Sequence, residues 1–189
     1  MSISGTSTNE RRVLHLLDAA RSRIEPRGTG PRRQVDLRRA VSDAYYAAFH
    51  FLIDRCTQCC LGSQPSDARY RDAVARGFKH SVMQKACRTF GSAGPLPKPL
   101  RSAYPVGTSP EPGVPAVPVS VRKFATQFVV MQEKRHAADY DWSRTFRLNE
   151  VEADIEVTAE VIDAFAAEPR SADVRFFLTA VTVWPGLSN

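Results

Sequence analysis

Apolar residues recur at helical spacing along most of the chain. In segments 7–24 and 148–167 they fall three or four positions apart, as they do on one face of an α-helix. Segment 33–61 has the widest apolar stripe, so we predict that it is the central helix of the fold. Its apolar positions are Leu37, Val41, Ala44, Tyr45, Ala48 and Leu52, with Tyr46, Phe49 and Ile53 beside them. No segment alternates apolar and polar residues as a strand does, which predicts an all-α fold.

Three further segments complete the predicted helices. Residues 66–90 are either one helix interrupted near Gly77 or a short turn followed by a helix over 78–90. Helix resumes at Ser120, and a last helix covers 171–184. Together these segments predict an antiparallel bundle of five or six helices.

The segment 91–118 interrupts this helical pattern. It holds eight prolines and several glycines, and proline removes a backbone donor and clashes inside a helix. We therefore predict no helix there, but a long mobile loop that lies outside the bundle. The whole chain, residues 1–189, is otherwise expected to form a single domain.

Composition narrows the classes of protein to consider. Hydrophobic residues make up 43% and charged residues 24%, as in ordinary globular proteins. No apolar run is long enough to cross a bilayer, and the first residues lack the apolar core of a signal peptide. Three cysteines, Cys56, Cys59 and Cys60, crowd together without a plausible disulfide pattern, which indicates a reducing cytoplasm. We expect no metal site, because Cys56-x-x-Cys59 lacks a second ligand pair, and no cofactor, because no cofactor-binding motif is present.

The charge is positive and uneven. The net charge is +6, and residues 1–40 contain nine arginines against four acidic residues. Such an excess suits a nucleic acid or another acidic partner, and the candidates for phosphate contact are Arg32, Arg33, Arg38 and Arg39. The alternative is a solvated face that keeps the protein soluble.

Two segments carry more specific motifs. Residues 37–50 begin with paired arginines and continue Ser-x-x-Tyr-Tyr-Ala-x-Phe-His, and residues 135–141 contain Arg-x-x-Ala-Asp-Tyr. Together they resemble the HEPN family of prokaryotic helical proteins. The Lys-His-Ser run at 79–81 and the segment 172–178 are also similar to that family. The resemblance extends from about residue 10 to residue 184.

The resemblance implies both a fold and two kinds of function. HEPN domains are antiparallel helical bundles that are often dimeric. Many are metal-independent ribonucleases whose Arg-x(4–6)-His motifs pair across a dimer. Others are non-catalytic partners of nucleotidyltransferases in toxin–antitoxin or antiviral defence systems. A ribonuclease needs an acid or base that works near neutral pH and a cation on the phosphate, which His and Arg supply.

This chain departs from the ribonuclease motif. Tyr140 and Trp142 stand where a histidine would follow Arg135, and tyrosine is a poor base near neutral pH. His136 directly follows Arg135, so it lies about 100° around the helix. Catalysis would require His136 to substitute, or a histidine from another helix to approach. The candidate catalytic residues are Arg135, His136, Asp139 and Tyr140, and the histidines of other helices are His50 and His80.

A structural interpretation competes with the catalytic one. Arg135 precedes Asp139 by four residues, so the two could form an ion pair that braces the bundle. Tyr45, Tyr46 and His50 are then core or interface residues. Two hypotheses remain: a binding or assembly module that partners itself, a nucleotidyltransferase-type protein or RNA, and an RNA endonuclease. Burial of Arg135 against Asp139 would favour the module, whereas two Arg135 side chains in a basic dimer cleft would favour the enzyme.

Overall fold

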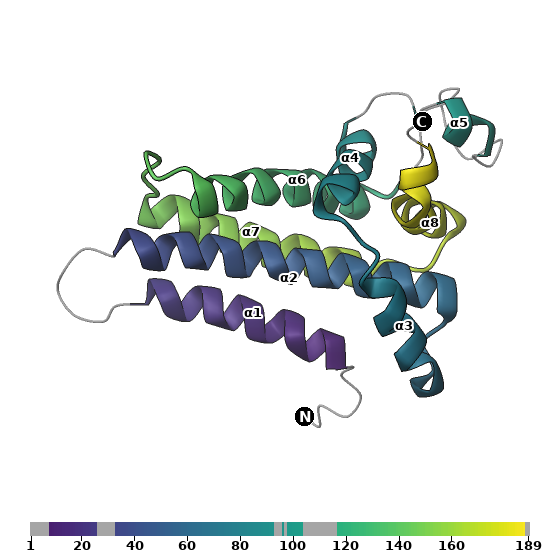
Figure 1. Ribbon diagram of the computed structural model, residues 1–189, viewed down its shortest axis with the longest axis horizontal. Coiled ribbons are helices and arrows are strands. Elements are labelled where there is room, and N and C mark those ends of the chain that lie inside the picture. The colour runs from purple at the N-terminus through teal and green to yellow at the C-terminus, as the bar shows by residue number, and fades with distance from the viewer. Residues whose placement is uncertain (1–7, 26–32, 93–95, 97, 104–116, 188–189) are drawn as a thin grey trace.

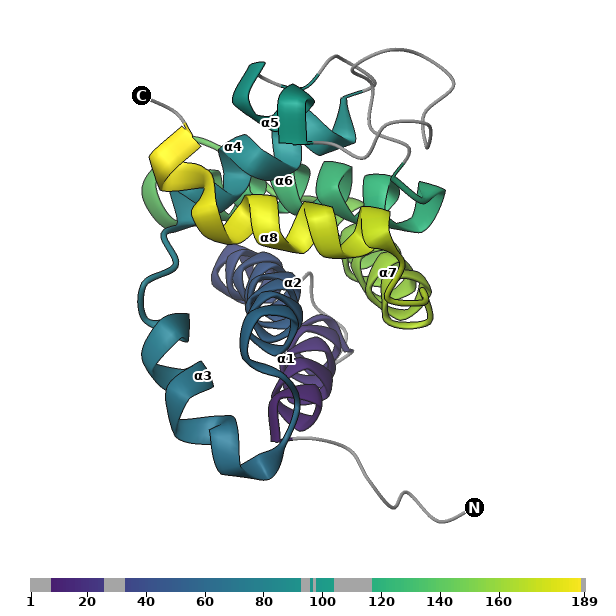
Figure 2. The ribbon, with the colours of Figure 1, turned by 90° about the vertical axis from the view of Figure 1, so that its right-hand side faces the viewer.

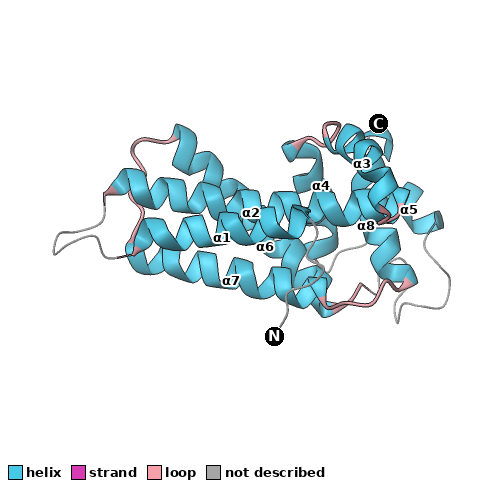
Figure 3. Ribbon diagram, turned by 90° about the horizontal axis from the view of Figure 1, so that it is seen from below, coloured by secondary structure: helices cyan, strands magenta, loops and turns pink. Residues whose placement is uncertain are grey.

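The computed structural model describes residues 8–25, 33–92, 96, 98–103 and 117–187. All regular structure within these ranges is helical (Figure 3). The α-helices are α1 (Thr8–Ile24), α2 (Gln34–Leu61), α3 (Ala68–Ala75), α4 (His80–Gly91), α5 (Lys98–Ala103), α6 (Val119–Tyr140), α7 (Leu148–Ala166) and α8 (Ala172–Leu187). A single 3₁₀ turn, Pro65–Asp67, precedes α3. The all-α prediction is confirmed, but the predicted number of five or six helices is too low for the described part, which holds eight.

The long helices form a bundle around α2. In Figure 1, α1, α2, α6 and α7 run side by side along the long axis, while α4 and α8 gather at one end. Figure 2 shows α8 crossing that end of the bundle. The central helix α2 packs against α1, α3, α6, α7 and α8, as its wide apolar stripe predicts.

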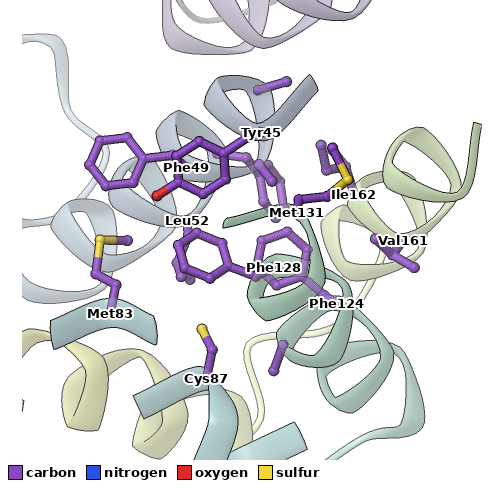
Figure 4. Packing of buried hydrophobic residues seen from close by; sticks show 14 of the residues in the cluster. Tyr45, Phe49, Leu52, Met83, Cys87, Phe124, Phe128, Met131, Val161 and Ile162 are labelled. Atoms are coloured by element: carbon purple, nitrogen blue, oxygen red, sulfur yellow. The ribbon is translucent and has the colours of Figure 1, made fainter. Parts of the chain in front are cut away.

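The core is one cluster of buried residues shared by α1, α2, α4, α6, α7 and α8, and its aromatic part lies between α2 and α6 (Figure 4). Tyr45, Phe49 and Leu52 of α2 face Phe124 and Phe128 of α6 (Figure 4). Small residues on α2 are also fully enclosed, and they let the neighbouring helices approach closely: Ala40, Ala44 and Ala47. Each large apolar side chain that is removed from water stabilises the fold by about 1.5–3 kcal/mol.

The proline-rich segment differs from its prediction. Residues Lys98–Ala103 form α5, which packs against α8. Pro99 is tolerated because it lies in the first turn, where backbone N–H groups have no partner within the helix. Leu96, Leu100 and Val117 are buried, so these residues do not lie outside the packed structure as predicted. The predicted loop is wrong for Lys98–Ala103, which is helical. The rest of that prediction, including its mobility, falls on residues 93–95, 97 and 104–116, outside the described residues.

The segment 66–90 is two helices separated by a break. Helix α3 ends at Ala75, a turn includes Gly77, and α4 begins at His80, as in the first of the two alternatives. At the end of the chain, α8 runs through Pro185 to Leu187 instead of ending before the proline. No helix in the described ranges is both long and apolar enough to cross a membrane.

Candidate functional site

The candidate residues of two distant motifs meet at one end of the bundle. Helix α6 ends where α2 begins (Figure 1), so residues 135–140 lie beside residues 38–46. Hydrogen bonds join the two helices at three points: from Arg38, from Ser42 and to Tyr46. The resemblance motifs therefore describe a single place in the structure, although about 90 residues separate them in sequence.

Arg135 is held by neighbours of its own chain. Its Nε lies 2.7 Å from Oδ2 of Asp139 one turn later, an ion pair whose N–H is not aligned for a hydrogen bond. Its Nη2 donates a 2.9 Å hydrogen bond to the hydroxyl of Tyr46. The other oxygen of Asp139 accepts a 3.0 Å hydrogen bond from Ser42. A chain of polar contacts therefore runs from Ser42 through Asp139 and Arg135 to Tyr46, and it ties α6 to α2.

Tyr45 and His80 form a second polar pair on the inner side of this chain. Tyr45 is fully buried, and burial raises the pKa of its hydroxyl well above the ordinary value. Burial, followed by the charge of Arg135, lowers the pKa of His80. Both groups are therefore neutral, and the Tyr45 hydroxyl lies 2.6 Å from Nδ1 of His80 in a hydrogen bond whose donor is set by the His80 tautomer. The ring of His80 is half-buried and stacks on Phe49 with centroids 4.0 Å apart.

His136 and Tyr140 lie on the outer surface of α6. Their ring centroids are 4.9 Å apart, and both side chains are exposed. The guanidinium of Arg135 lies 6.0 Å from the Tyr140 ring. His136 therefore pairs with Tyr140 on another face of the helix, as its position directly after Arg135 predicts.

Arg38 has a role that its sequence did not indicate. Only 8% of its side chain is exposed, and its guanidinium donates to backbone carbonyl oxygens at the end of α6. The acceptors are the carbonyl oxygens of Ala137 at 3.3 Å, Ala138 at 2.9 Å, Asp141 at 2.9 Å and Arg144 at 2.5 Å. Because these donors are engaged by carbonyl oxygens, the prediction that Arg38 contacts a phosphate is wrong. Arg33 and Arg39 are exposed, and Arg32 lies outside the described residues.

The surface beside this network is hollowed and aromatic. A groove of about 580 Å³ is lined at its exposed edge by Val35, Arg39, Tyr140, Trp142 and Arg144, which we call the terminal face. Trp142 is 85% exposed and Tyr140 is 65% exposed. In the sequence, Trp142 is notable only as a residue that stands where a histidine would follow Arg135. A tryptophan in a short polar turn, beside several arginines, is the signal that could have identified it.

The remaining candidates lie elsewhere. His50 stacks on the Tyr46 ring with centroids 6.3 Å apart and is half-buried on the side of α2 that faces α3. Cys56 is buried, Cys59 is half-buried and Cys60 is exposed. Among the described residues, no three His, Cys, Asp or Glu side chains gather as metal ligands would.

No protein-family model, curated protein or solved structure matches this chain. The resemblance to the HEPN family therefore depends on the motifs at 37–50 and 135–141.

Proposed function

We propose that this chain is a HEPN-like assembly module that pairs with a second copy of itself through the terminal face. The observation that carries the proposal is the contact of Arg135 with Asp139 and Tyr46. A guanidinium held in this way braces two helices, and the Asp139 carboxylate already neutralises the charge that would attract a phosphate. The arrangement favours the binding hypothesis over the catalytic one.

The chemistry of the terminal face supports assembly. Trp, Tyr and Arg are the residues that most often carry the binding energy of protein interfaces, and Tyr140, Trp142, Arg39 and Arg144 bring all three types together. Leaving a tryptophan in water forfeits the free energy that its burial in an interface would provide. Surface aromatics grouped around a groove are therefore typical of a binding surface.

The terminal face also has charges of both signs. Arg39 and Arg144 line the groove together with Asp139, and the exposed Asp141 lies between Tyr140 and Trp142 in the chain. A two-fold interface requires self-complementarity, because each residue meets a different residue of the other copy. Opposite charges on one surface meet that requirement. The resemblance to the HEPN family suggests a nucleotidyltransferase-type protein as the other partner, in a toxin–antitoxin or antiviral defence system. The proposal includes a cytoplasmic location.

The test is the molar mass in solution. Sedimentation equilibrium over a wide range of protein concentration should show a monomer–dimer equilibrium. Trp142→Ala should weaken dimerisation by tenfold or more, because it removes the most exposed aromatic side chain of the face. Val119→Ala, at an exposed apolar position at the other end of α6, is the matched control and should leave the equilibrium unchanged. A monomer at every concentration would contradict self-assembly and leave the nucleotidyltransferase-type partner to be tested.

A metal-independent RNA endonuclease is the second candidate, and one observation favours it. Arg135 and His80 both lie against the ring of Tyr46, at 5.5 Å and 6.1 Å from its centroid, so an imidazole and a cation are neighbours. The hydroxyl of Tyr45 already engages one ring nitrogen of His80, which limits that imidazole as a base. The test is incubation of purified protein with RNA in a chelator. Cleavage that is lost in folded Arg135→Ala and His80→Gln variants would establish the enzyme.

A further inference from the structure

A second groove lies on the other side of α2 from α6 and α7. Figure 2 shows α3 standing beside α2 and α1 on the side away from α7. The groove between these elements has a volume of about 520 Å³, within the range typical of small-molecule sites. It is distinct from the terminal face, because the two share no lining residue.

Three arginines line this groove. Arg12 comes from α1, Arg71 comes from α3, and Arg76 directly follows the last residue of α3. In the part of the chain that the structure describes, none of the three forms an ion pair with a carboxylate. Arg71 is held in place by hydrogen bonds to the carbonyl oxygens of Gly62 at 3.1 Å and Gln64 at 2.9 Å. Three cations that line one hollow attract an anion.

Two of the four histidines add further donors to the same groove. His50 and His80 both line it, from α2 and from the start of α4. Burial, Arg12 and His80 lower the pKa of His50, while burial and Arg135 lower the pKa of His80. Both imidazoles are therefore neutral near pH 7, and each neutral ring carries one N–H donor.

The groove also contains carboxylates and an apolar wall. Asp54 accepts a 2.6 Å hydrogen bond from Gln58, and Asp72 is exposed on α3. Three arginines against two aspartates leave the groove with one net positive charge. Phe49, Ile53 and Phe78 form the apolar part of the lining. An inorganic anion makes no use of such a wall, whereas an organic group beside the anion would pack on it.

We propose that the α2–α3 groove binds a small organic ligand that carries a phosphate group. The phosphate lies among Arg12, Arg71 and Arg76, since guanidinium groups form strong charge-assisted hydrogen bonds to phosphate oxygens. The organic part of the ligand packs against Phe49 and Phe78. This site is independent of the dimer contact proposed for the terminal face.

Binding is coupled to protonation of His50. A phosphate dianion next to Arg12 cancels the arginine charge that disfavours the imidazolium and adds an attractive charge of its own. The pKa of His50 therefore rises when the site is occupied. A ligand that bound elsewhere on the surface would leave this titration unchanged.

The experiment measures binding of phenyl phosphate to the full chain by titration calorimetry. NMR of the histidine ring protons measures the pKa of His50 with and without the ligand. Phenyl phosphate should bind saturably at millimolar concentration or below, and should raise the pKa of His50. Inorganic phosphate should bind more weakly, because it leaves Phe49 and Phe78 uncovered. Arg12→Gln and Arg76→Gln should each weaken phenyl phosphate binding by about tenfold. Arg69→Gln, on α3 but outside the groove, is the matched control and should bind as the parent protein does.

Three results would overturn the proposal. Absence of saturable binding at millimolar phenyl phosphate would remove the site. If Arg69→Gln weakened phenyl phosphate binding as much as the groove variants do, the net charge of the surface, and not the groove, would explain the binding. Equal affinity for inorganic phosphate and phenyl phosphate would show that the apolar wall contributes nothing to binding, so the ligand would be an anion without an organic part. Each variant is first shown to unfold cooperatively in urea, so that loss of binding is not loss of the fold.

Discussion

The guanidinium of Arg38, near the start of α2, donates a 2.9 Å hydrogen bond to the carbonyl oxygen of Ala138, one hundred residues further along the chain. The last carbonyl groups of a helix have no partner within the helix, and α6 ends at Tyr140 with Asp141 instead of a glycine as its C-cap. Arg38 satisfies four carbonyls at this end of α6 and in the following turn. It thereby holds the segment that carries Tyr140 and Trp142 against α2.

The first prediction concerns this arginine. Arg38→Ala should lower the free energy of unfolding by about 2–4 kcal/mol, because it leaves buried carbonyl groups without donors. Arg39→Ala is a matched control from the next position, where the side chain is exposed, and should change stability by less than about 0.5 kcal/mol. Urea denaturation followed by circular dichroism measures both. Equal stability of the two variants would mean that the capping contacts contribute nothing.

The second prediction separates a structural Arg135 from a catalytic one. Arg135→Ala should cost about 1–3 kcal/mol, since it removes the partner of Asp139 and of the Tyr46 hydroxyl at a half-buried site. Asp139→Asn should cost a similar amount. The double variant should cost less than the two single costs together, because both changes remove the same ion pair. Strict additivity would indicate that the two side chains do not interact in solution.

The third prediction is a loss of stability in mild acid. The pKa values of His50 and His80 in the folded protein lie below the ordinary value of 6.5, so the unfolded chain binds protons more readily. Stability is therefore fully present above about pH 6.5 and falls as the pH drops toward the lowered pKa values of the folded state. Urea denaturation at a series of pH values measures the effect. His80→Gln should reduce the pH dependence, whereas His15→Gln, at an exposed position on α1, should leave it in place.

The fourth prediction concerns the packed part of the proline-rich segment. Leu100 of α5 is only 4% exposed. Leu100→Ala should lower the free energy of unfolding by about 2–4 kcal/mol, through lost burial and the cavity that remains. Ser102→Ala, at an exposed position two residues later, should be nearly neutral. If both variants are as stable as the parent, the segment does not pack on α8 in solution.

The fifth prediction tests whether the exposed arginines contact nucleic acid. If Arg33 and Arg39 neutralise phosphates, replacing both with glutamine should weaken RNA binding at low salt. The slope of log affinity against log salt should then become shallower by about two units. Filter binding over a range of salt concentrations measures this slope. Absence of binding at low salt would leave the solvated-face interpretation of the basic N-terminal region.

Most helices of this protein are determined by local sequence. The spacing of apolar residues in 33–61 and 148–167 predicted α2 and α7 to within one residue at each end, because one buried helix face requires that spacing. Apolar spacing does not predict α5, because the eight prolines of 91–118 indicate a loop and the segment has only two leucines, Leu96 and Leu100. A proline in the first turn of a helix is not a breaker, and only burial of Leu96 and Leu100 shows that the segment packs.

The candidate site was predicted only where its partners are close in sequence. The pairing of Arg135 with Asp139 follows from a separation of one helical turn, and the structure has that contact. The roles of Arg38 and Trp142 depended on where the end of α6 meets the start of α2. No local pattern encodes that meeting, because the acceptors of Arg38 are backbone carbonyls, which every residue has.

Charge alone was likewise ambiguous in the sequence. Arg38 and Arg39 are adjacent and chemically identical, yet one is enclosed by carbonyl oxygens and the other faces solvent. Successive residues on a helix point about 100° apart, so which of the two turns inward depends on the neighbouring helix. By itself, the sequence determined that this chain folds into helices and which side of each long helix is apolar. Tertiary packing alone decided which polar side chains brace the bundle and which remain free to bind a partner, because those contacts join helices that are distant in the chain.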